Sequence, residues 1–219
     1  MIRQNPRPPH GSHQSLKTGA PLFLWILVGV MTAIEAVLSL SDAGLTGALS
    51  LRWPAFALGA FWQPIFSGAM EPIYPGQKLL MFVTYAFLHG GFMHLALNSV
   101  ILLSLGKVAA SRIGERKTLL VLFISAVSGG FAFGIISSGS APMIGASGAV
   151  FGFIGLWQAW DYEMRKLHSL PLQPVITAVL GLVAANGIIF VMLGGGLAWE
   201  AHLGGWVMGW FSARRFARH

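Results

Sequence analysis

Six long apolar stretches separated by short polar segments dominate the pattern of this chain. Each approaches the roughly 20 residues that a helix needs to cross a bilayer, and they cover residues 21–40, 79–105, 118–136, 147–160, 174–193 and 200–216. The pattern predicts an all-α polytopic membrane protein, a bundle of six transmembrane helices within one domain of residues 21–219. Residues 1–20 are polar and basic, and we expect them to form a disordered cytoplasmic tail.

A seventh apolar segment, residues 53–70, is interrupted by Pro54 and Pro64. Counting it as a span would reverse every later loop and place seven basic residues outside. Its aromatic side chains suit the membrane interface. We therefore interpret it as a half-buried extracytoplasmic loop, although the pattern alone leaves open whether it is interfacial or inserted.

Composition supports a membrane protein and removes several other classes. Only 10% of the residues are charged, against about 25% in ordinary soluble domains, and the mean hydropathy is +0.69. A net charge of +7 would suggest nucleic acid for a soluble protein, but cytoplasmic loops of membrane proteins also collect Lys and Arg, so we expect no nucleic-acid partner. The chain has no cysteine, which excludes disulfides and a thiol nucleophile.

The basic residues predict the orientation. With the amino terminus inside, 12 of the 14 fall on the cytoplasmic side, and only Arg52 and Lys78 fall outside. Both termini are therefore expected in the cytoplasm. Short tails and the lack of a transit sequence favour a bacterial inner membrane.

Candidate chemistry begins at Gly145-Ala146-Ser147-Gly148, which opens the fourth stretch. In the first turn of a helix, unpaired backbone N–H groups and the positive dipole end can stabilise a developing negative charge near Ser147. A stretch that starts there is short, so the preceding loop has to dip into the membrane, where irregular backbone must be buried or line a cavity. His202 lies in the last stretch, where histidine is costly and suggests function. The pair predicts a hydrolase working within the bilayer.

Other polar residues lie in the apolar stretches. His94 and Asn98 are four residues apart, so they share one helix face and could bind an oxyanion. Asn186 and Glu200 are also near membrane depth, and Glu35 has no visible partner and receives no role. Glycines at small-residue spacing allow close helix approach; they are Gly148, Gly152 and Gly155 in the fourth stretch, and Gly205 and Gly209 in the sixth.

Taken together, these segments closely resemble the rhomboid family of intramembrane serine proteases. The matching segments, in order and each in its own stretch, are residues 84–98, 145–148 and 201–209. The resemblance covers the chain from about residue 21 to its carboxyl end.

The resemblance implies a role for each matching residue. Ser147 would be the nucleophile and His202 the general base of a Ser-His dyad. The oxyanion and substrate site would contain His94, Asn98, Gly145 and the Ser147 backbone N–H. Supporting positions would be His89, with a structural role, Phe151, which packs against the base, and Gly205. The resemblance implies single-span membrane proteins as substrates, cleaved near the extracytoplasmic interface, and no cofactor.

Two other classes compete with this interpretation. A catalytically silent rhomboid-like binder of membrane helices would typically lack Ser147 or His202, which are both present. A transporter or channel would show an inverted repeat and more intramembrane ionisable groups, and we find neither. The histidines lack an H-E-x-x-H or similar motif, so we expect no metal site. The oligomeric state and the individual substrate do not follow from the sequence.

Overall fold

The structure is a computed structural model that describes residues 19–45, 47 and 50–216. The expected disordered tail therefore lies almost entirely outside the described residues. Within them the chain is helical, and the only β-type pairing is an isolated bridge between Phe61 and Met143.

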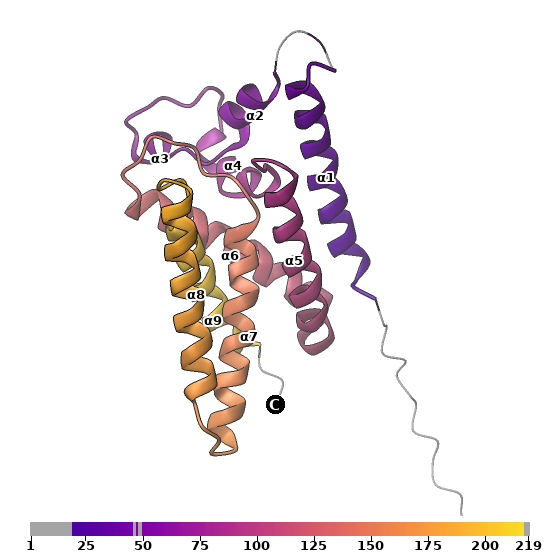
Figure 1. The fold of residues 1–219 in the computed structure, drawn as a ribbon, viewed down its shortest axis with the longest axis vertical. Helices are drawn as coiled ribbons and strands as arrows, with labels where there is room; N and C mark the ends of the chain where they lie inside the picture. The colour runs from indigo at the N-terminus through magenta and orange to yellow at the C-terminus, as the bar shows by residue number, and fades with distance from the viewer. Residues whose placement is uncertain (1–18, 46, 48–49, 217–219) are drawn as a thin grey trace, which may run out of the picture.

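Six long helices make up the bundle (Figure 1). Their bounds are α1 Leu22–Asp42, α5 Phe92–Ile113, α6 Glu115–Ile136, α7 Ser147–Leu167, α8 Gln173–Met192 and α9 Trp199–Arg215. Among the described residues, α1, α5, α6 and α8 are long and apolar enough to cross a membrane. The other two, α7 and α9, pack mainly against each other and against α6, and bury the most residues for their length. The six-helix expectation is thus confirmed, with the two less apolar helices in the interior.

The second predicted span is not one helix. Residues 79–105 fall in α4 (Gln77–Thr84), the 3-10 turn η1 (Tyr85–Phe87) and the first part of α5. The break follows from Gly90-Gly91, because Gly91 has φ +128°, a conformation that favours glycine. The prediction of a continuous helix was wrong because apolar composition does not reveal such a break. His94 and Asn98 both remain on α5.

Residues 53–70 do not form a span. They fold into two short helices, α2 (Arg52–Gly59) and α3 (Gln63–Ser67), of 8 and 5 residues, at the end of the bundle where α5 begins (Figure 1). Phe61 between them is fully buried, and its ring meets those of Phe82, Tyr85 and Phe133 edge-on. Aromatic burial thus attaches this segment to α4 and α6.

Glu35, for which the sequence suggested no partner, forms a buried ion pair. Arg52 of α2 contacts both of its carboxylate oxygens, at 2.9 and 3.2 Å, and also donates to the backbone oxygen of His89 at 2.9 Å. The Glu35 hydrogen bond raises the pKa of Arg52 above its usual value, so the guanidinium stays charged. The lack of a partner was a wrong inference, because the partner is 17 residues away, in a segment outside the predicted spans.

Glycines set the separation of α7 and α9. A methyl group on Gly205 would lie 1.8 Å from the carbonyl oxygen of Gly148, and one on Gly209 equally close to that of Gly152. Ordinary contact needs 3.4–4 Å, so no larger residue fits without separating the helices. The predicted small-residue stripes therefore face each other, and they bring His202 towards the start of α7.

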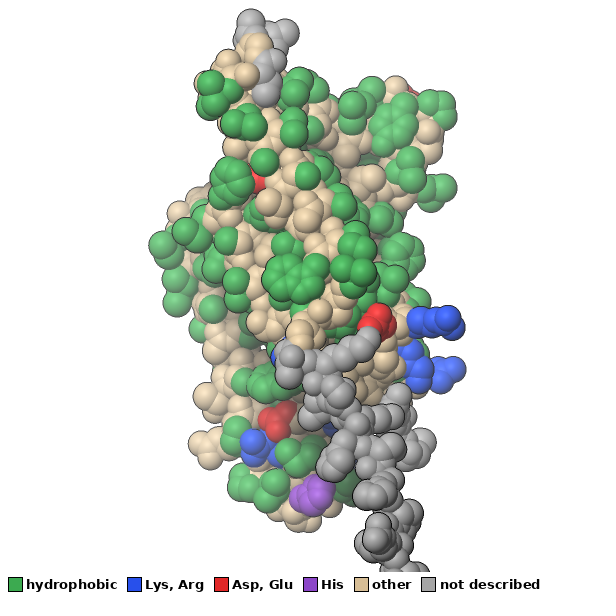
Figure 2. Space-filling view, turned by 90° about the vertical axis from the view of Figure 1, so that its right-hand side faces the viewer, with side chains coloured by type: hydrophobic (Ala, Val, Ile, Leu, Met, Phe, Trp, Pro, Cys, Tyr) green, Lys and Arg blue, Asp and Glu red, His purple; other side chains and the backbone are tan. Residues whose placement is uncertain are grey.

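Charge is distributed unevenly along the bundle. On the face in Figure 2, hydrophobic side chains cover the upper and middle parts, whereas Lys, Arg and His side chains gather in the lower part. At the same end, Arg112 packs over Trp160, and Arg214 of α9 pairs with Glu163 of α7. The short helices α2 and α3 lie at the opposite end (Figure 1).

Candidate active site

Ser147 is the first residue of α7, and its hydroxyl faces a histidine of α9. The distance between Ser147 Oγ and His202 Nε2 is 2.8 Å, a hydrogen bond between residues 55 apart in sequence. As the first helical residue, Ser147 has a backbone N–H for which the helix offers no acceptor. The structure therefore brings the two predicted residues together, in the geometry that a nucleophile and its base require.

The loop before Ser147 is held by several contacts. Gly145 has φ +112°, and its N–H donates to the carbonyl oxygen of Tyr85 at 2.9 Å. The Tyr85 hydroxyl donates to the Ala126 carbonyl of α6 at 2.9 Å. The Ala146 N–H points to Nε2 of buried His89 at 3.5 Å. His89 thus contacts the loop that precedes Ser147.

Two polar side chains of α5 converge on the same loop. A methyl group on Gly145 would lie 2.7 Å from His94 Nε2 and 3.6 Å from Asn98 Nδ2, so only glycine permits this approach. Asn98 is buried, and its Nδ2 has no hydrogen-bond partner among the described residues. Because a buried unpaired donor is costly, this amide suits a site that receives an acceptor from a ligand.

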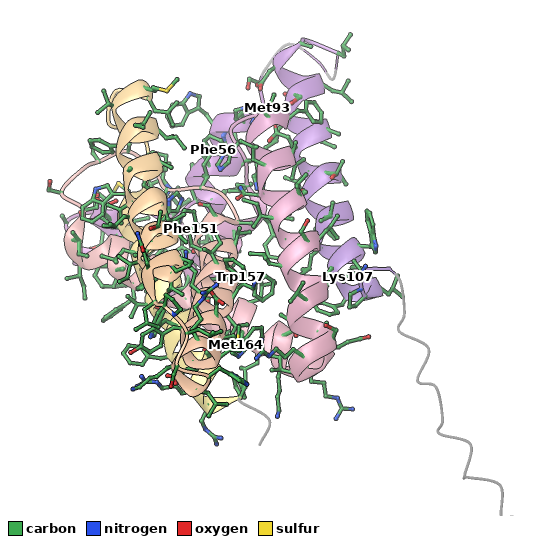
Figure 3. The ribbon with its side chains drawn as sticks, turned by 60° about the horizontal axis from the view of Figure 1, so that its bottom comes forward. Phe56, Met93, Lys107, Phe151, Trp157 and Met164 are labelled. Atoms are coloured by element: carbon green, nitrogen blue, oxygen red, sulfur yellow. The ribbon has the colours of Figure 1, made fainter. Side chains whose placement is uncertain are left out.

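The imidazole of His202 is enclosed on one side by Phe151. The two rings are stacked, and Phe151 lies one helical turn after Ser147 on α7. Figure 3 shows Phe151 on the side of the bundle formed by α7 and α8, away from α1. Gly205, three residues after His202, touches the α7 backbone. Phe151 thus packs against the His202 ring, and Gly205 lies against α7.

Asn186 of α8 contacts His202, although the sequence assigned no particular role to it. Its Oδ1 lies 2.6 Å from Nδ1 of His202, on the side of the ring opposite Ser147. One feature of the sequence pointed to a functional role for Asn186, because its amide lies in an otherwise apolar spanning stretch. The sequence could not reveal the contact, because it depends on how α8 is rotated against α9.

An apolar cavity of about 470 Å³ lies between α8 and the helices α7 and α9. His202 and Asn186 line it together with Phe151, Trp199 and Trp206. Over the described residues, no three His, Asp or Glu side chains gather as metal ligands would.

Residues 76–219 match the family model of the Rhomboid domain. The fold and site define a class of protein, a helical bundle with a partly buried serine–histidine pair between two of its helices, α7 and α9. The chain belongs to the rhomboid family. Because four helices among its described residues are also apolar and of spanning length, it is an integral membrane protein.

Several curated proteins are similar in sequence. The chain is 31% identical to Rhomboid-like protease 3 of Toxoplasma gondii over 196 residues, which cover 85% of this chain and 65% of that protein. It is 31% identical to Rhomboid protease GlpG of Serratia proteamaculans over 143 residues, or 65% of this chain and 50% of that protein. GlpG of Yersinia pestis strain Pestoides F is also 31% identical, over 60% of this chain and 46% of that protein. The chain thus spans about half to two thirds of the length of these relatives.

Proposed function

We propose that this protein is an intramembrane serine endopeptidase that cleaves single-span membrane proteins through a Ser147–His202 dyad. The observation that supports the proposal most directly is the 2.8 Å hydrogen bond between Ser147 Oγ and His202 Nε2 at the start of α7. The names of the similar proteins, rhomboid proteases, agree with this assignment.

In the proposed reaction, Ser147 Oγ attacks the scissile carbonyl carbon while His202 Nε2 accepts the hydroxyl proton. The resulting oxyanion accepts hydrogen bonds from Asn98 Nδ2, from His94 and from the backbone N–H of Ser147. His202 then donates its proton to the leaving amine, which leaves an acyl ester on Ser147. A water molecule, deprotonated by His202, hydrolyses this ester and restores both residues.

The substrate class follows from where the serine lies. A transmembrane helix hides its carbonyl groups in hydrogen bonds, so a substrate must unwind locally before Ser147 can attack it. We therefore expect substrates with Gly, Pro or other helix-weakening residues near the cleaved bond.

The proposed topology follows from the charge distribution. Basic residues gather at one end of the bundle (Figure 2), and α2 and α3 lie at the other. The positive-inside rule then puts both termini in the cytoplasm and the entrance to Ser147 on the extracytoplasmic side. We propose a bacterial inner membrane and a protease domain of residues 21–219.

A fluorophosphonate probe and a fluorescent single-span substrate, both applied to the purified protein in proteoliposomes, test the function. We expect the unchanged protein to be labelled by the probe and to cleave the substrate, and Ser147→Ala to do neither. Ser212→Ala, a control at the far end of α9, should be labelled and should cleave. Failure of the unchanged protein to label or cleave would favour a silent helix-binding protein or a transporter and reject the proposal.

A further inference from the structure

The amide of Asn186 has one possible orientation. Its Nδ2 donates to the carbonyl oxygen of Leu182, one turn earlier in α8, at 2.9 Å. Since a carbonyl oxygen can only accept, the NH₂ group must face it, and Oδ1 is left to face His202 Nδ1 at 2.6 Å. The α8 backbone therefore determines how this side chain is presented to the base.

That orientation also determines the tautomer of His202. Because Oδ1 can only accept, the proton of the neutral imidazole must lie on Nδ1, and Nε2 is left as an acceptor. Nε2 is the nitrogen that lies 2.8 Å from Ser147 Oγ. The hydrogen bonds thus run in one direction, from the Ser147 hydroxyl to Nε2 and from Nδ1–H to Asn186, as a general base requires.

The helix that supplies Asn186 is loosely attached to the bundle. Only 6% of the spanning window of α8 is buried, and the 470 Å³ cavity separates part of it from α7 and α9. Among the described residues, Asn186 is the one α8 side chain that hydrogen-bonds to another helix. Surroundings of low dielectric strengthen such a bond. Asn186 therefore connects a weakly packed helix directly to the base.

We propose that Asn186 is a positioning residue for His202, and that the base is correctly oriented only while α8 lies against the bundle. This inference rests on the proposed function and adds a third, uncharged member to the dyad. When α8 moves away, Nδ1 loses its acceptor, and the proton and the ring are free to adopt other arrangements. The position of α8 thus controls the base itself.

Three substitutions test the inference. Asn186→Leu keeps a similar shape but removes the acceptor, and Asn186→Asp keeps an acceptor. Ile188→Ala truncates an exposed apolar side chain of the same helix that does not line the cavity. For each variant, kcat and KM for the single-span substrate are measured in proteoliposomes, together with the unfolding midpoint in detergent.

We expect Asn186→Leu to lower kcat about 10- to 100-fold, a loss within the range of misoriented general bases, with KM changed less than about twofold. Asn186→Asp should recover most of that loss, and Ile188→Ala should have nearly the unchanged kcat. An unchanged kcat in Asn186→Leu, or an equal loss in Ile188→Ala, would overturn the inference, because either result would show that the hydrogen bond from His202 to Asn186 does not orient the base.

A second measurement does not depend on turnover. In protein labelled with ¹⁵N-histidine, the His202 ring signals, assigned by their loss in His202→Ala, report which nitrogen carries the proton. We expect the Nδ1–H form to predominate in the unchanged protein and to lose that dominance in Asn186→Leu. If the two proteins had the same tautomer populations, the positioning role would be rejected. If the unchanged protein cleaves and Ser147→Ala does not, the proposed function stands whatever Asn186 does.

Discussion

The imidazole of His202 lies flat on the ring of Phe151, with the ring centroids 3.9 Å apart and the planes inclined by 9°. Phe151 belongs to α7, the same helix that presents Ser147, one turn earlier. The plane of the His202 ring is therefore set by the helix that carries Ser147, whereas Asn186 of α8 contacts its Nδ1 and so bears on its tautomer. The stack with Phe151 thus restricts the orientation of the His202 ring plane, and the contact with Asn186 restricts which ring nitrogen carries the proton.

Phe151→Ala should lower kcat while leaving KM nearly unchanged. An aromatic stack contributes about 0.5–1.5 kcal/mol beyond area burial, which corresponds to a loss of about 2- to 13-fold. Phe151→Tyr keeps the stacked ring and serves as the matched variant, with activity close to that of the unchanged protein. Steady-state cleavage in proteoliposomes measures both; equal activity of Phe151→Ala would mean that the stack does not orient the base.

Ser147→Ala and His202→Ala should each reduce cleavage by about 10⁴-fold or more, and the double variant should be no slower than either single one. The reason is that hydroxyl and imidazole act as one unit, so that removing the second costs nothing further. Cleavage is followed over long incubations, and circular dichroism checks that each variant is folded. Additive losses in the double variant would contradict the shared role.

Asn98→Ala should slow cleavage by about 10²–10³-fold, the value of one oxyanion donor. Fluorophosphonate labelling of Ser147 should persist in part, because His94 and the Ser147 N–H remain. Ser99→Ala, the neighbouring residue on α5, provides the control and should cleave normally. A normal cleavage rate in Asn98→Ala would assign this amide to packing instead.

Arg52→Ala should destabilise the protein by about 3–5 kcal/mol, because it leaves the fully buried Glu35 carboxylate without its partner. Asp161→Asn, which removes a partly exposed pair with Arg165, should cost about 0.5 kcal/mol or less. Equilibrium unfolding in detergent compares the two variants. Similar losses would show that burial of Glu35 adds nothing to the importance of its ion pair.

Gly205→Ala should reduce both stability and activity, since the new methyl group would lie 1.8 Å from the Gly148 carbonyl oxygen. Overpacking of this kind costs about 1–3 kcal/mol, and separating α7 from α9 also lengthens the Ser147–His202 hydrogen bond. Gly29→Ala and Gly181→Ala make the same change in spanning helices with nothing within 4 Å. These controls should be neutral or slightly stabilising in unfolding and cleavage assays; an equally neutral Gly205→Ala would refute the close-packing argument.

The sequence by itself determined the long helices, the serine and histidine that are candidates for the site, and the glycine stripes on the helices that carry them. These features are local: apolar length predicts a spanning helix, and residue type at a fixed spacing predicts which face of a helix carries it. The same reasoning placed Ser147 at a helix start and His94 with Asn98 on one face, as the structure has them.

Only the tertiary structure decided the contacts between distant segments. The Glu35–Arg52 pair, the break before Phe92 and the hydrogen bond from His202 to Asn186 depend on how helices are rotated and where glycine turns the backbone. Apolar spanning stretches do not encode such rotation, because in lipid every face of a helix can be hydrophobic. The sequence therefore shows that a polar residue lies in an apolar stretch, but only the packing of the helices decides which group it contacts.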